Sequence, residues 1–447
     1  MKTKSLSLLL TILLMGCTPG HKPALKIASS SSVSGTGTVI PDTAKVSIVK
    51  ILSSGRTISV GGSGADIRGF SSSAIQAACD AVHMAGGGRV ILMSGVFNIE
   101  APVRIFDNMT ISGSGTGTIL RKCKGFRSAF ALDADYGELK INVKDPSGFH
   151  TGMGVAIYDN DHRSGWDVTT ARITAIRNND VYIDSWLLRD YNSAKGGTLS
   201  NACSVIEAVD AQNLKISDLA IDGARETNDI VDGCRVGAIY LHKVKNALVE
   251  NIKVSDFNCD GISWQITEHV TVRNCEVTGC ANAGLHPGTG SPYTVIEKNK
   301  CHNNGGYGLF VCWRVRNGVV KDNIFYANGI NGICTGHKDV DMLYSGNYIY
   351  DNAGDGINLR GETELNAPHR SIFRKNIIEN NGTKGGGYGL SVNSMASGVV
   401  LEDNTFRSNG KGNQLAAVML MKNSLLVEMK NNRIDNHPKG ELVKAND

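Results

Sequence analysis

Several features that often define a protein class are scarce in this 447-residue chain. Proline occurs only 9 times, and aromatic residues make up 6% of the chain. Lys and Arg total 46 against 42 Asp and Glu, so the net charge is only +4 and no segment is strongly basic. A chain without a basic stripe is not expected to bind nucleic acid. The apolar stretch near the N-terminus is too short to span a bilayer as a helix, and no later stretch is long and apolar enough to do so.

Glycine, in contrast, is abundant: 52 of the 447 residues are Gly, well above the share of about 7% in an ordinary protein. Many Gly and Asn residues with few Pro predict frequent, regular turns and exclude a Pro/Gly-rich disordered chain. The length permits two or three ordinary domains or one long repeat architecture.

The N-terminus combines a basic start with a short apolar run. Lys2 and Lys4 precede the run Leu6 to Met15, which ends in Leu-Met-Gly-Cys at Cys17. This arrangement resembles a bacterial lipoprotein signal, which implies loss of residues 1–16, a lipid anchor on Cys17 and a place in the cell envelope. Residues 17–55 would then form a flexible tether. An ordinary signal peptide with an incidental Cys17 is the alternative, and either interpretation places the chain outside the cytoplasm.

Ten cysteines follow Cys17, an even number that permits disulfides in an oxidising compartment. Their spacing fits no zinc-binding pattern. We expect most of them to be buried thiols that fill a stacked core. They are Cys79, Cys123, Cys203, Cys234, Cys259, Cys275, Cys280, Cys301, Cys312 and Cys334.

An internal repeat of 23–24 residues begins near residue 237. Each repeat holds short alternating segments, an Asn and an Asn/Gly turn, which suits one coil of three short strands and three turns. Leucine-rich repeats have a similar period but need a fixed Leu framework that is missing here. Because Asn tolerates the left-handed region, we expect the recurring Asn to form a ladder of turn residues. Its members are Asn251, Asn274, Asn299, Asn323, Asn347, Asn376, Asn404 and Asn432.

These repeats resemble those of the right-handed parallel β-helix in carbohydrate-active enzymes, most clearly over residues 200–435. Residues 61–122, with a helix starting near Ser73, resemble the N-terminal entry of pectate-lyase-like proteins, where a helix covers the open end of the stack. The resemblance implies an all-β fold: a single-stranded right-handed parallel β-helix with an N-terminal helical cap. The predicted organisation is a cap with first coils over 56–135, inserted strands or loops over 136–200, and β-helix repeats over 201–447.

Period-2 alternation after each coil-boundary Gly assigns side chains to the two faces of one strand per coil. The first residue is apolar and should point inward: Ile239, Ile262, Leu285, Leu309, Ile333, Ile357 and Leu390. The second and fourth should point outward: Tyr240 and His242, Ser263 and Gln265, His286 and Gly288, Phe310 and Cys312, Cys334 and Gly336, Asn358 and Arg360, Ser391 and Asn393. Trp313, Arg314, His337, Lys338, Asp339 and Glu362 follow just past these strands.

Cationic and aromatic residues recur on this outer face over four coils, which span roughly 15 Å at the usual strand spacing. That length fits a few sugar units. Aromatic rings can stack on sugar faces, and cations suit carboxylates or sulfates. A solvated polar face is the alternative. The predicted substrate-binding residues are Arg360, Glu362, Trp313, Phe310, His242, Gln265 and Asn358.

Residues 284–315 resemble the catalytic stretch of alginate C5-epimerases. Pro287 matches the Pro of the family's G-[FI]-D-P-H-D motif and Arg314 matches its later Arg, whereas His286 stands at the Asp position and Gly288 at the His position. The resemblance implies a site for a uronate. Motifs of polygalacturonase-type glycosidases are missing.

The preferred hypothesis is a polysaccharide lyase or epimerase that removes the C5 proton of an acidic polysaccharide or oligosaccharide. Arg314 or Arg360 would neutralise the uronate carboxylate, and His337 or Lys338 would be the base. His286 would be an acid or a binding residue, and Asp339 would orient Lys338. Calcium at the acidic run 339–341 is an alternative to a turn there.

Two other function classes stay open. A glycoside hydrolase would use Asp339 and Glu362, with Asp260 as a further carboxylate, because hydrolases need two carboxyl groups at a defined spacing. A non-catalytic glycan-binding surface protein would need no such pair.

Overall fold

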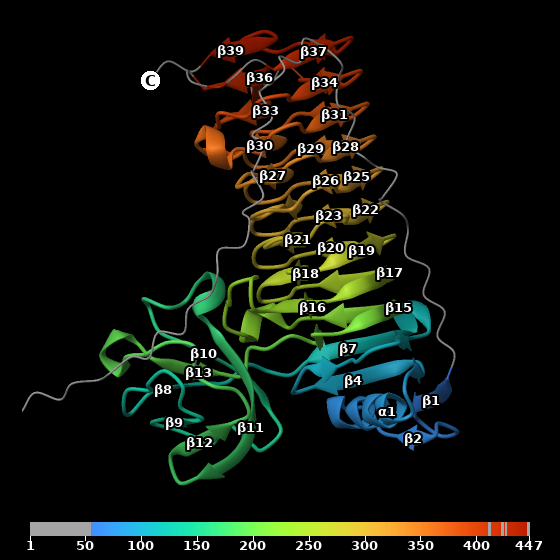
Figure 1. Cartoon of the computed structure of the whole chain (residues 1–447), viewed down its shortest axis with the longest axis vertical. Helices are drawn as coiled ribbons and strands as arrows, with labels where there is room; N and C mark the ends of the chain where they lie inside the picture. Colours follow the sequence, from blue (N-terminus) through green and yellow to red (C-terminus); the bar gives the residue numbers. More distant parts are fainter. Residues whose placement is uncertain (1–54, 410–412, 422–423, 425–426, 445–447) are drawn as a thin grey trace, which may run out of the picture. The chain divides into compact units, whose positions relative to one another are not determined.

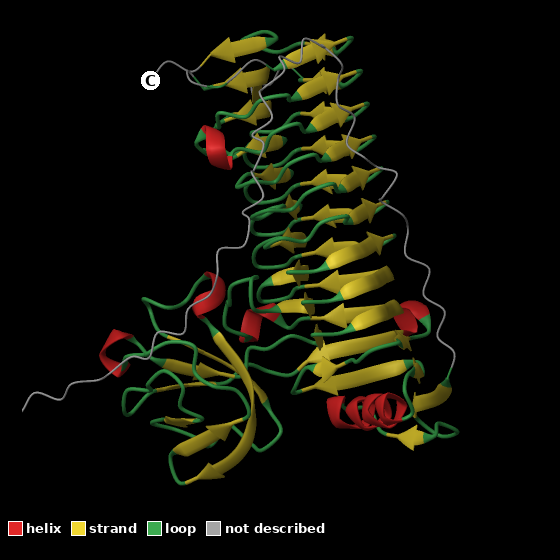
Figure 2. Cartoon of the chain, viewed as in Figure 1, coloured by secondary structure: helices red, strands yellow, loops and turns green. Residues whose placement is uncertain are grey.

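The computed structural model describes residues 55–409, 413–421, 424 and 427–444. The predicted signal, the lipid attachment at Cys17 and nearly all of the predicted tether lie outside the described residues. Within the part that is described, no helix is long and apolar enough to cross a membrane. Strands dominate this part, and its one α-helix is α1 (Ser72–Met84) (Figure 2).

The main body is a parallel β-helix, in which each coil adds one strand to each face of a stack (Figure 1). One face is a sheet of 11 parallel strands in the following order. The strands are β5 (Val103–Arg104), β14 (Ile206–Val209), β16 (Gly237–His242), β18 (Asp260–Gln265), β21 (Leu285–Gly288), β24 (Leu309–Phe310), β27 (Ile333–Thr335), β30 (Ile357–Leu359), β33 (Gly387–Val392), β36 (Gln414–Leu420) and β39 (Leu442–Lys444).

The remaining strands of the coils belong to a 22-stranded parallel set. They are β1 (Arg56–Gly61), β2 (Ile67–Arg68), β3 (Gly88–Leu92), β4 (Gly95–Ile99), β6 (Met109–Ser112), β7 (Thr118–Lys122), β15 (Gln212–Asp222), β17 (Lys245–Ser255), β19 (Glu268–Arg273), β20 (Glu276–Thr278), β22 (Val295–Glu297), β23 (Lys300–His302), β25 (Val319–Lys321), β26 (Ile324–Tyr326), β28 (Leu343–Ser345), β29 (Tyr348–Tyr350), β31 (Ile372–Arg374), β32 (Ile377–Glu379), β34 (Val400–Glu402), β35 (Thr405–Arg407), β37 (Glu428–Lys430) and β38 (Arg433–Asp435).

The predicted inward residues form one continuous row along the 11-stranded sheet. Ile239 pairs with Ile262, Ile262 with Leu285, and the row continues through Leu309, Ile333, Ile357 and Leu390. All seven side chains are fully buried. The alternation predicted from the sequence is therefore confirmed, and with it the assignment of the outward residues.

Two ladders of buried amides link successive coils. In the predicted ladder, Asn323 Nδ2 donates to Asn347 Oδ1 at 2.9 Å, and the same bond recurs from Asn299 to Asn432. A second ladder, which the sequence analysis missed, runs through Asn304, Asn328, Asn352, Asn381 and Gln414. Gly332 stands where two coils approach closely. A Cβ there would lie 2.8 Å from Asn352 Nδ2 and 2.7 Å from the carbonyl oxygen of Gly356, so a side chain would crowd the neighbouring coil.

The predicted ladder was wrong at its first two positions and in its physical reason. Asn251 and Asn274 have left-handed backbones, with φ of 56° and 52°. Asn299 and Asn323 do not; in their coils, the preceding residue is the left-handed one. Cys275 holds the ladder position in its coil, where its backbone N–H donates to Asn299 Oδ1 at 3.0 Å. The ladder Asn is thus selected for its inward amide, not for a left-handed turn.

The N-terminal part is not capped by a helix alone, which corrects the expected helical cap. Helix α1 starts after the N-cap Ser71 and buries Ile75, Ala78, Cys79 and Val82, a spacing typical of one helix face. The chain then leaves the coils to form a six-stranded antiparallel sheet. Its strands are β8 (Arg127–Ala129), β9 (Lys140–Asn142), β10 (Gly154–Tyr158), β11 (Thr169–Arg177), β12 (Asp180–Ile183) and β13 (Thr198–Ser200).

This antiparallel insertion begins nine residues before the predicted boundary at 136 and has a hydrophobic core of its own, around Phe130, Ile157 and Leu199. The ten cysteines after Cys17 are all free thiols, and seven of them are buried. The expectation that most of them are buried thiols is therefore confirmed, and five of them belong to the main hydrophobic core: Cys79, Cys259, Cys275, Cys280 and Cys301.

Candidate functional site

The outward face of the 11-stranded sheet carries two columns of side chains, as predicted. In the first, Tyr240 pairs with Ser263 and Ser263 with His286, and the column continues through Phe310, Cys334, Asn358 and Ser391. In the second, His242 pairs with Gln265, followed by Gly288 and Cys312. The face is therefore a continuous surface, and neighbours within each column come from successive coils, about 24 positions apart in the sequence.

Residues 228–236 cross this face over β16 and β18 and bury it there. Ser263 Oγ donates to the carbonyl of Gly233 at 2.7 Å, and the Tyr240 hydroxyl donates to the carbonyl of Cys234 at 2.8 Å. A Cβ on Gly233 would overlap Asp260 Oδ2, so only glycine fits there. We call residues 228–236 the crossing segment. It separates an open part of the face, beyond β21, from an enclosed part at β5, β14 and β16.

His286 lies beneath the crossing segment, not in the open part. Its side chain is 2% exposed, and its Nδ1 is 2.7 Å from Oδ2 of the fully buried Asp260. Asp260 Oδ1 also accepts hydrogen bonds from Asn282 Nδ2 and the Ala283 N–H. Burial lowers the pKa of His286, but the charge of Asp260 and the hydrogen bond to it outweigh burial and raise the pKa to about 10. This geometry is that of a buried ion pair, and His286 Nε2 has no hydrogen-bond partner among the described residues.

In the open part, Arg360 contacts two other predicted residues, Phe310 and Asp339. Its guanidinium lies 4.7 Å above the centre of the Phe310 ring, and its Nη2 is 3.8 Å from Asp339 Oδ2. Asp339 is fully buried, and its two oxygens accept the backbone N–H groups of Val315 and Gly336. Burial raises the pKa of Asp339 to about 6, against the opposing effect of Arg360.

A second group lies just past the strand ends. His337 Nδ1 is 3.2 Å from Glu362 Oε1, with both side chains about one-fifth exposed, at 21% and 20%. The Trp313 ring lies 4.9 Å from the His337 ring, and Arg314 lies 5.9 Å from the Trp313 ring centre. Trp313 and Arg314 have φ of 70° and 64°, a pair of left-handed residues that turns the chain out of its strand.

Three other predicted residues have different surroundings. Lys338 is exposed, and its described contact is a backbone hydrogen bond to the carbonyl of Asn366. Gln265 is buried and donates to Ser263. Asn358 donates to Ser391 at 2.8 Å. The structure thus joins His337, Glu362, Trp313 and Arg314 in one group, and Arg360, Phe310 and Asp339 in another.

The acidic run 339–341 does not fit a calcium ion. Asp339 accepts two backbone N–H groups, and Asp341 forms two hydrogen bonds with Arg370, at 2.6 and 2.8 Å. Among the described residues, no group of three or more His, Cys, Asp or Glu is placed to hold a metal ion. The run has the turn role that the sequence analysis favoured.

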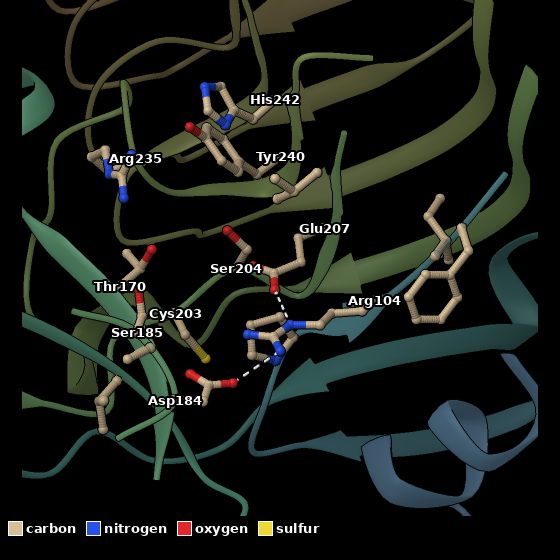
Figure 3. A pocket seen from close by; sticks show the side chains of 16 residues that line it. Arg104, Thr170, Asp184, Ser185, Cys203, Ser204, Glu207, Arg235, Tyr240 and His242 are labelled. Atoms are coloured by element: carbon tan, nitrogen blue, oxygen red, sulfur yellow. Dashed lines mark hydrogen bonds and ion pairs between the residues drawn. The ribbon is translucent and has the colours of Figure 1, made fainter. Parts of the chain in front are cut away.

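The enclosed part of the face holds a cavity of about 400 Å³ (Figure 3). It is lined by His242 and by four charged residues that the sequence analysis did not single out: Arg104, Asp184, Glu207 and Arg235. These four come from distant parts of the chain. The sequence analysis placed Asp184 only within the inserted strands or loops predicted over 136–200.

A family model for the right handed beta helix region matches residues 154–365 and 336–446. These matches cover more than half of the chain, which therefore belongs to this family, and they confirm the predicted handedness of the coils. Within the family, the chain shows distant similarity to mannuronan C5-epimerases. Mannuronan C5-epimerase AlgE5 of Azotobacter vinelandii is 24% identical over 315 residues, which cover 70% of this chain and 23% of that protein.

Two solved structures share the fold. The A-module of mannuronan C-5 epimerase AlgE6 from Azotobacter vinelandii superposes with a TM-score of 0.56 at 16% identity, covering 84% of this chain and 95% of the module. A polygalacturonase from Erwinia carotovora ssp. carotovora gives a TM-score of 0.51 at 13% identity, covering 88% of this chain and 96% of the enzyme. The chain spans about a quarter of the length of the curated epimerase that it matches.

Proposed function

We propose that the protein is a carbohydrate-active enzyme that removes the C5 proton of a uronate residue in an acidic polysaccharide. The observation that carries this proposal is the contact between His337 Nδ1 and Glu362 Oε1 on the open part of the face. A carboxylate on Nδ1 fixes the imidazole with its Nε2 available as a base, which is the arrangement that proton abstraction needs.

Neutralisation of the substrate carboxylate is the second requirement, because it acidifies the C5 proton. Arg314 is exposed beside Trp313 and can reach an anionic sugar that stacks on that ring. Arg360 is held against Phe310 and Asp339, so it contributes a fixed positive charge at the adjacent position. We assign the base to His337 rather than to Lys338, since Lys338 has no comparable carboxylate contact in the described structure.

The reaction divides after this step. Return of a proton to the opposite face of C5 inverts the sugar, whereas loss of the C4 substituent gives an unsaturated lyase product. Epimerisation is the first choice, because the curated relatives are named mannuronan C5-epimerases. Elimination is the second outcome of the same test. The hydrolase alternative has weaker support, because both oxygens of Asp339 are already engaged by backbone N–H groups.

The test is incubation with mannuronan, guluronan and polygalacturonate in D2O. If the reaction is epimerisation, NMR detects deuterium at C5 together with inversion of that carbon. Elimination leaves C5 without a hydrogen, and ultraviolet absorbance detects its unsaturated product. His337→Gln is expected to lower the exchange rate by ~10²–10⁴-fold, and Glu362→Gln by less. His269→Gln, on β19 of the other sheet, is the matched control. Deuterium incorporation or formation of the unsaturated product at the wild-type rate in His337→Gln refutes this assignment. New reducing ends with neither deuterium at C5 nor an unsaturated product point to a hydrolase. Binding without any reaction points to a glycan-binding protein.

A further inference from the structure

The cavity in the enclosed part of the face is a second, separate site. It lies between β5, β14 and β16 of the β-helix and strands β10 and β11 of the antiparallel insertion, which contribute Val155, Thr170 and Ala171. Its volume of about 400 Å³ falls within the roughly 300–1,000 Å³ typical of small-molecule sites. The crossing segment, which contributes Arg235, separates it from the group around His337.

One wall is a fixed network of charges. Arg104 Nε is 2.7 Å from Glu207 Oε1, and Arg104 Nη1 is 3.0 Å from Asp184 Oδ2 (Figure 3). Asp184 Oδ1 accepts the backbone N–H of Arg172. These bonds hold carboxylate and guanidinium groups side by side, so the wall offers acceptors and donors at fixed positions.

The opposite wall combines rings with a further cation. The rings are those of Tyr240 and His242, whose centres lie 6.3 Å apart, and the cation is Arg235. Trp166 does not line the cavity but contacts two of these residues: its ring centre lies 5.4 Å from the His242 ring and 5.6 Å from the Arg235 guanidinium, which donates to the carbonyl of Val168. Burial, followed by the charge of Arg235, lowers the pKa of His242 to about 4, so the imidazole is neutral at pH 7. His242 Nε2 is buried without a hydrogen-bond partner among the described residues, so a ligand in the cavity can supply the missing partner.

The charges of this cavity balance. Arg104 and Arg235 oppose Asp184 and Glu207 in equal number, whereas in the open part the three cations Arg314, Lys338 and Arg360 outnumber the two carboxylates Asp339 and Glu362. A ligand that fits here donates and accepts many hydrogen bonds, presents an apolar face to the rings and carries no net charge. Hydroxyl-rich sugars have these properties.

We propose that this cavity binds one or two residues of a neutral saccharide. Glu207 and Asp184 accept its hydroxyl groups, Arg235 and the neutral His242 bond to its oxygens, and Tyr240 and His242 cover its apolar face. This site does not depend on the C5 chemistry proposed above, so the two proposals fail separately.

The experiment is isothermal titration of the full chain with glucose, mannose and galactose, with their β-1,4-linked disaccharides, and with a mannuronate disaccharide. A neutral disaccharide is expected to bind one to one with a Kd below about 1 mM. Ser185→Trp, which fills the cavity while leaving the Arg104 network in place, should weaken binding at least tenfold. Glu207→Gln should do the same if it folds. Ser94→Trp, on an exposed turn outside the cavity, is the matched control.

Any of three outcomes overturns the proposal. No neutral sugar binds even at a sugar concentration about ten times the expected upper limit of the Kd, binding is unchanged in Ser185→Trp, or only the mannuronate disaccharide binds. The proposal is also refuted if Trp313→Ala, and not Ser185→Trp, abolishes binding of the neutral sugar, because the sugar would then lie in the open part. Loss of binding in Ser185→Trp with wild-type binding in Ser94→Trp supports the proposal, whether or not the enzyme turns over uronates.

Discussion

Replacement of Asp260 and His286 decides whether His286 is a structural or a catalytic residue. Both side chains are almost completely buried, with exposed fractions of 0% and 2%. Removing one partner of a buried ion pair leaves an unpaired charge and typically costs ~3–5 kcal/mol of the free energy of unfolding. Asp260→Asn should lie at the low end of that range, because the amide oxygen can still accept the N–H groups of Asn282 and Ala283. His286→Leu should lie at the high end.

The assay is guanidinium unfolding of the two single variants and the double variant, followed by circular dichroism. The double variant should lose less than the sum of the singles, because it removes both charges together, and coupling of residues in contact is typically ~0.5–3 kcal/mol. C5 exchange, measured under conditions where each variant stays folded, should change little. The reasoning is refuted if His286→Leu unfolds within ~1 kcal/mol of wild type yet exchanges at least ~10²-fold more slowly, since that combination marks a catalytic group.

Three further predictions concern stability. Because the pKa of His286 is raised from 6.5 to about 10, its ion pair should contribute fully to stability below pH 6.5, and this contribution should be lost as the pH rises through about 10. In Asp260→Asn, the free energy of unfolding should therefore depend less on pH across that range than in the wild type. An unchanged pH dependence would contradict the prediction. Asn323→Ala should cost ~1–3 kcal/mol because it leaves buried ladder partners unsatisfied, whereas Asn393→Ala, which removes one 3.3 Å hydrogen bond, should stay within ~0.5 kcal/mol; equal losses in these two unfolding measurements would argue against the ladder. Gly332→Ala should cost ~1–3 kcal/mol through crowding of Asn352 and the next coil, and a melting temperature equal to that of wild type would show that the coils can separate at no cost.

The coil architecture could be predicted because the local pattern and the long-range pairing have the same period. Each inward residue, such as Ile333, pairs with the corresponding residues of the coils before and after it. Alternation within one strand therefore fixes the face of every equivalent strand. The Asn ladder was predicted less well, because a left-handed Asn such as Asn274 and an inward Asn such as Asn299 look alike in a sequence.

The site could be predicted only where it follows the coils. The outward columns were correct, and the contact of His337 with Glu362 joins two residues 25 positions apart, one coil to the next. The crossing segment broke the period, so the burial of His286 was missed. The enclosed cavity was missed for the same reason: Arg104 meets Asp184 across 80 positions and Glu207 across 103 positions. No periodic pattern relates residues brought together by an insertion.

The two halves of the outward face therefore differ for a physical reason that the repeat itself does not contain. The β-helix supplies strands at a constant spacing and would, alone, give a face of uniform character. In the open half, the left-handed pair Trp313 and Arg314 turns exposed groups outward, and positive charge stays in contact with solvent. In the enclosed half, the insertion brings Asp184 beside Arg104, which also contacts Glu207, so the charges there are paired although Arg104 and Asp184 stay partly exposed. An anionic polymer suits the first environment and a neutral sugar the second. Taken together, the two proposals predict a polysaccharide in which charged and neutral sugars occur together.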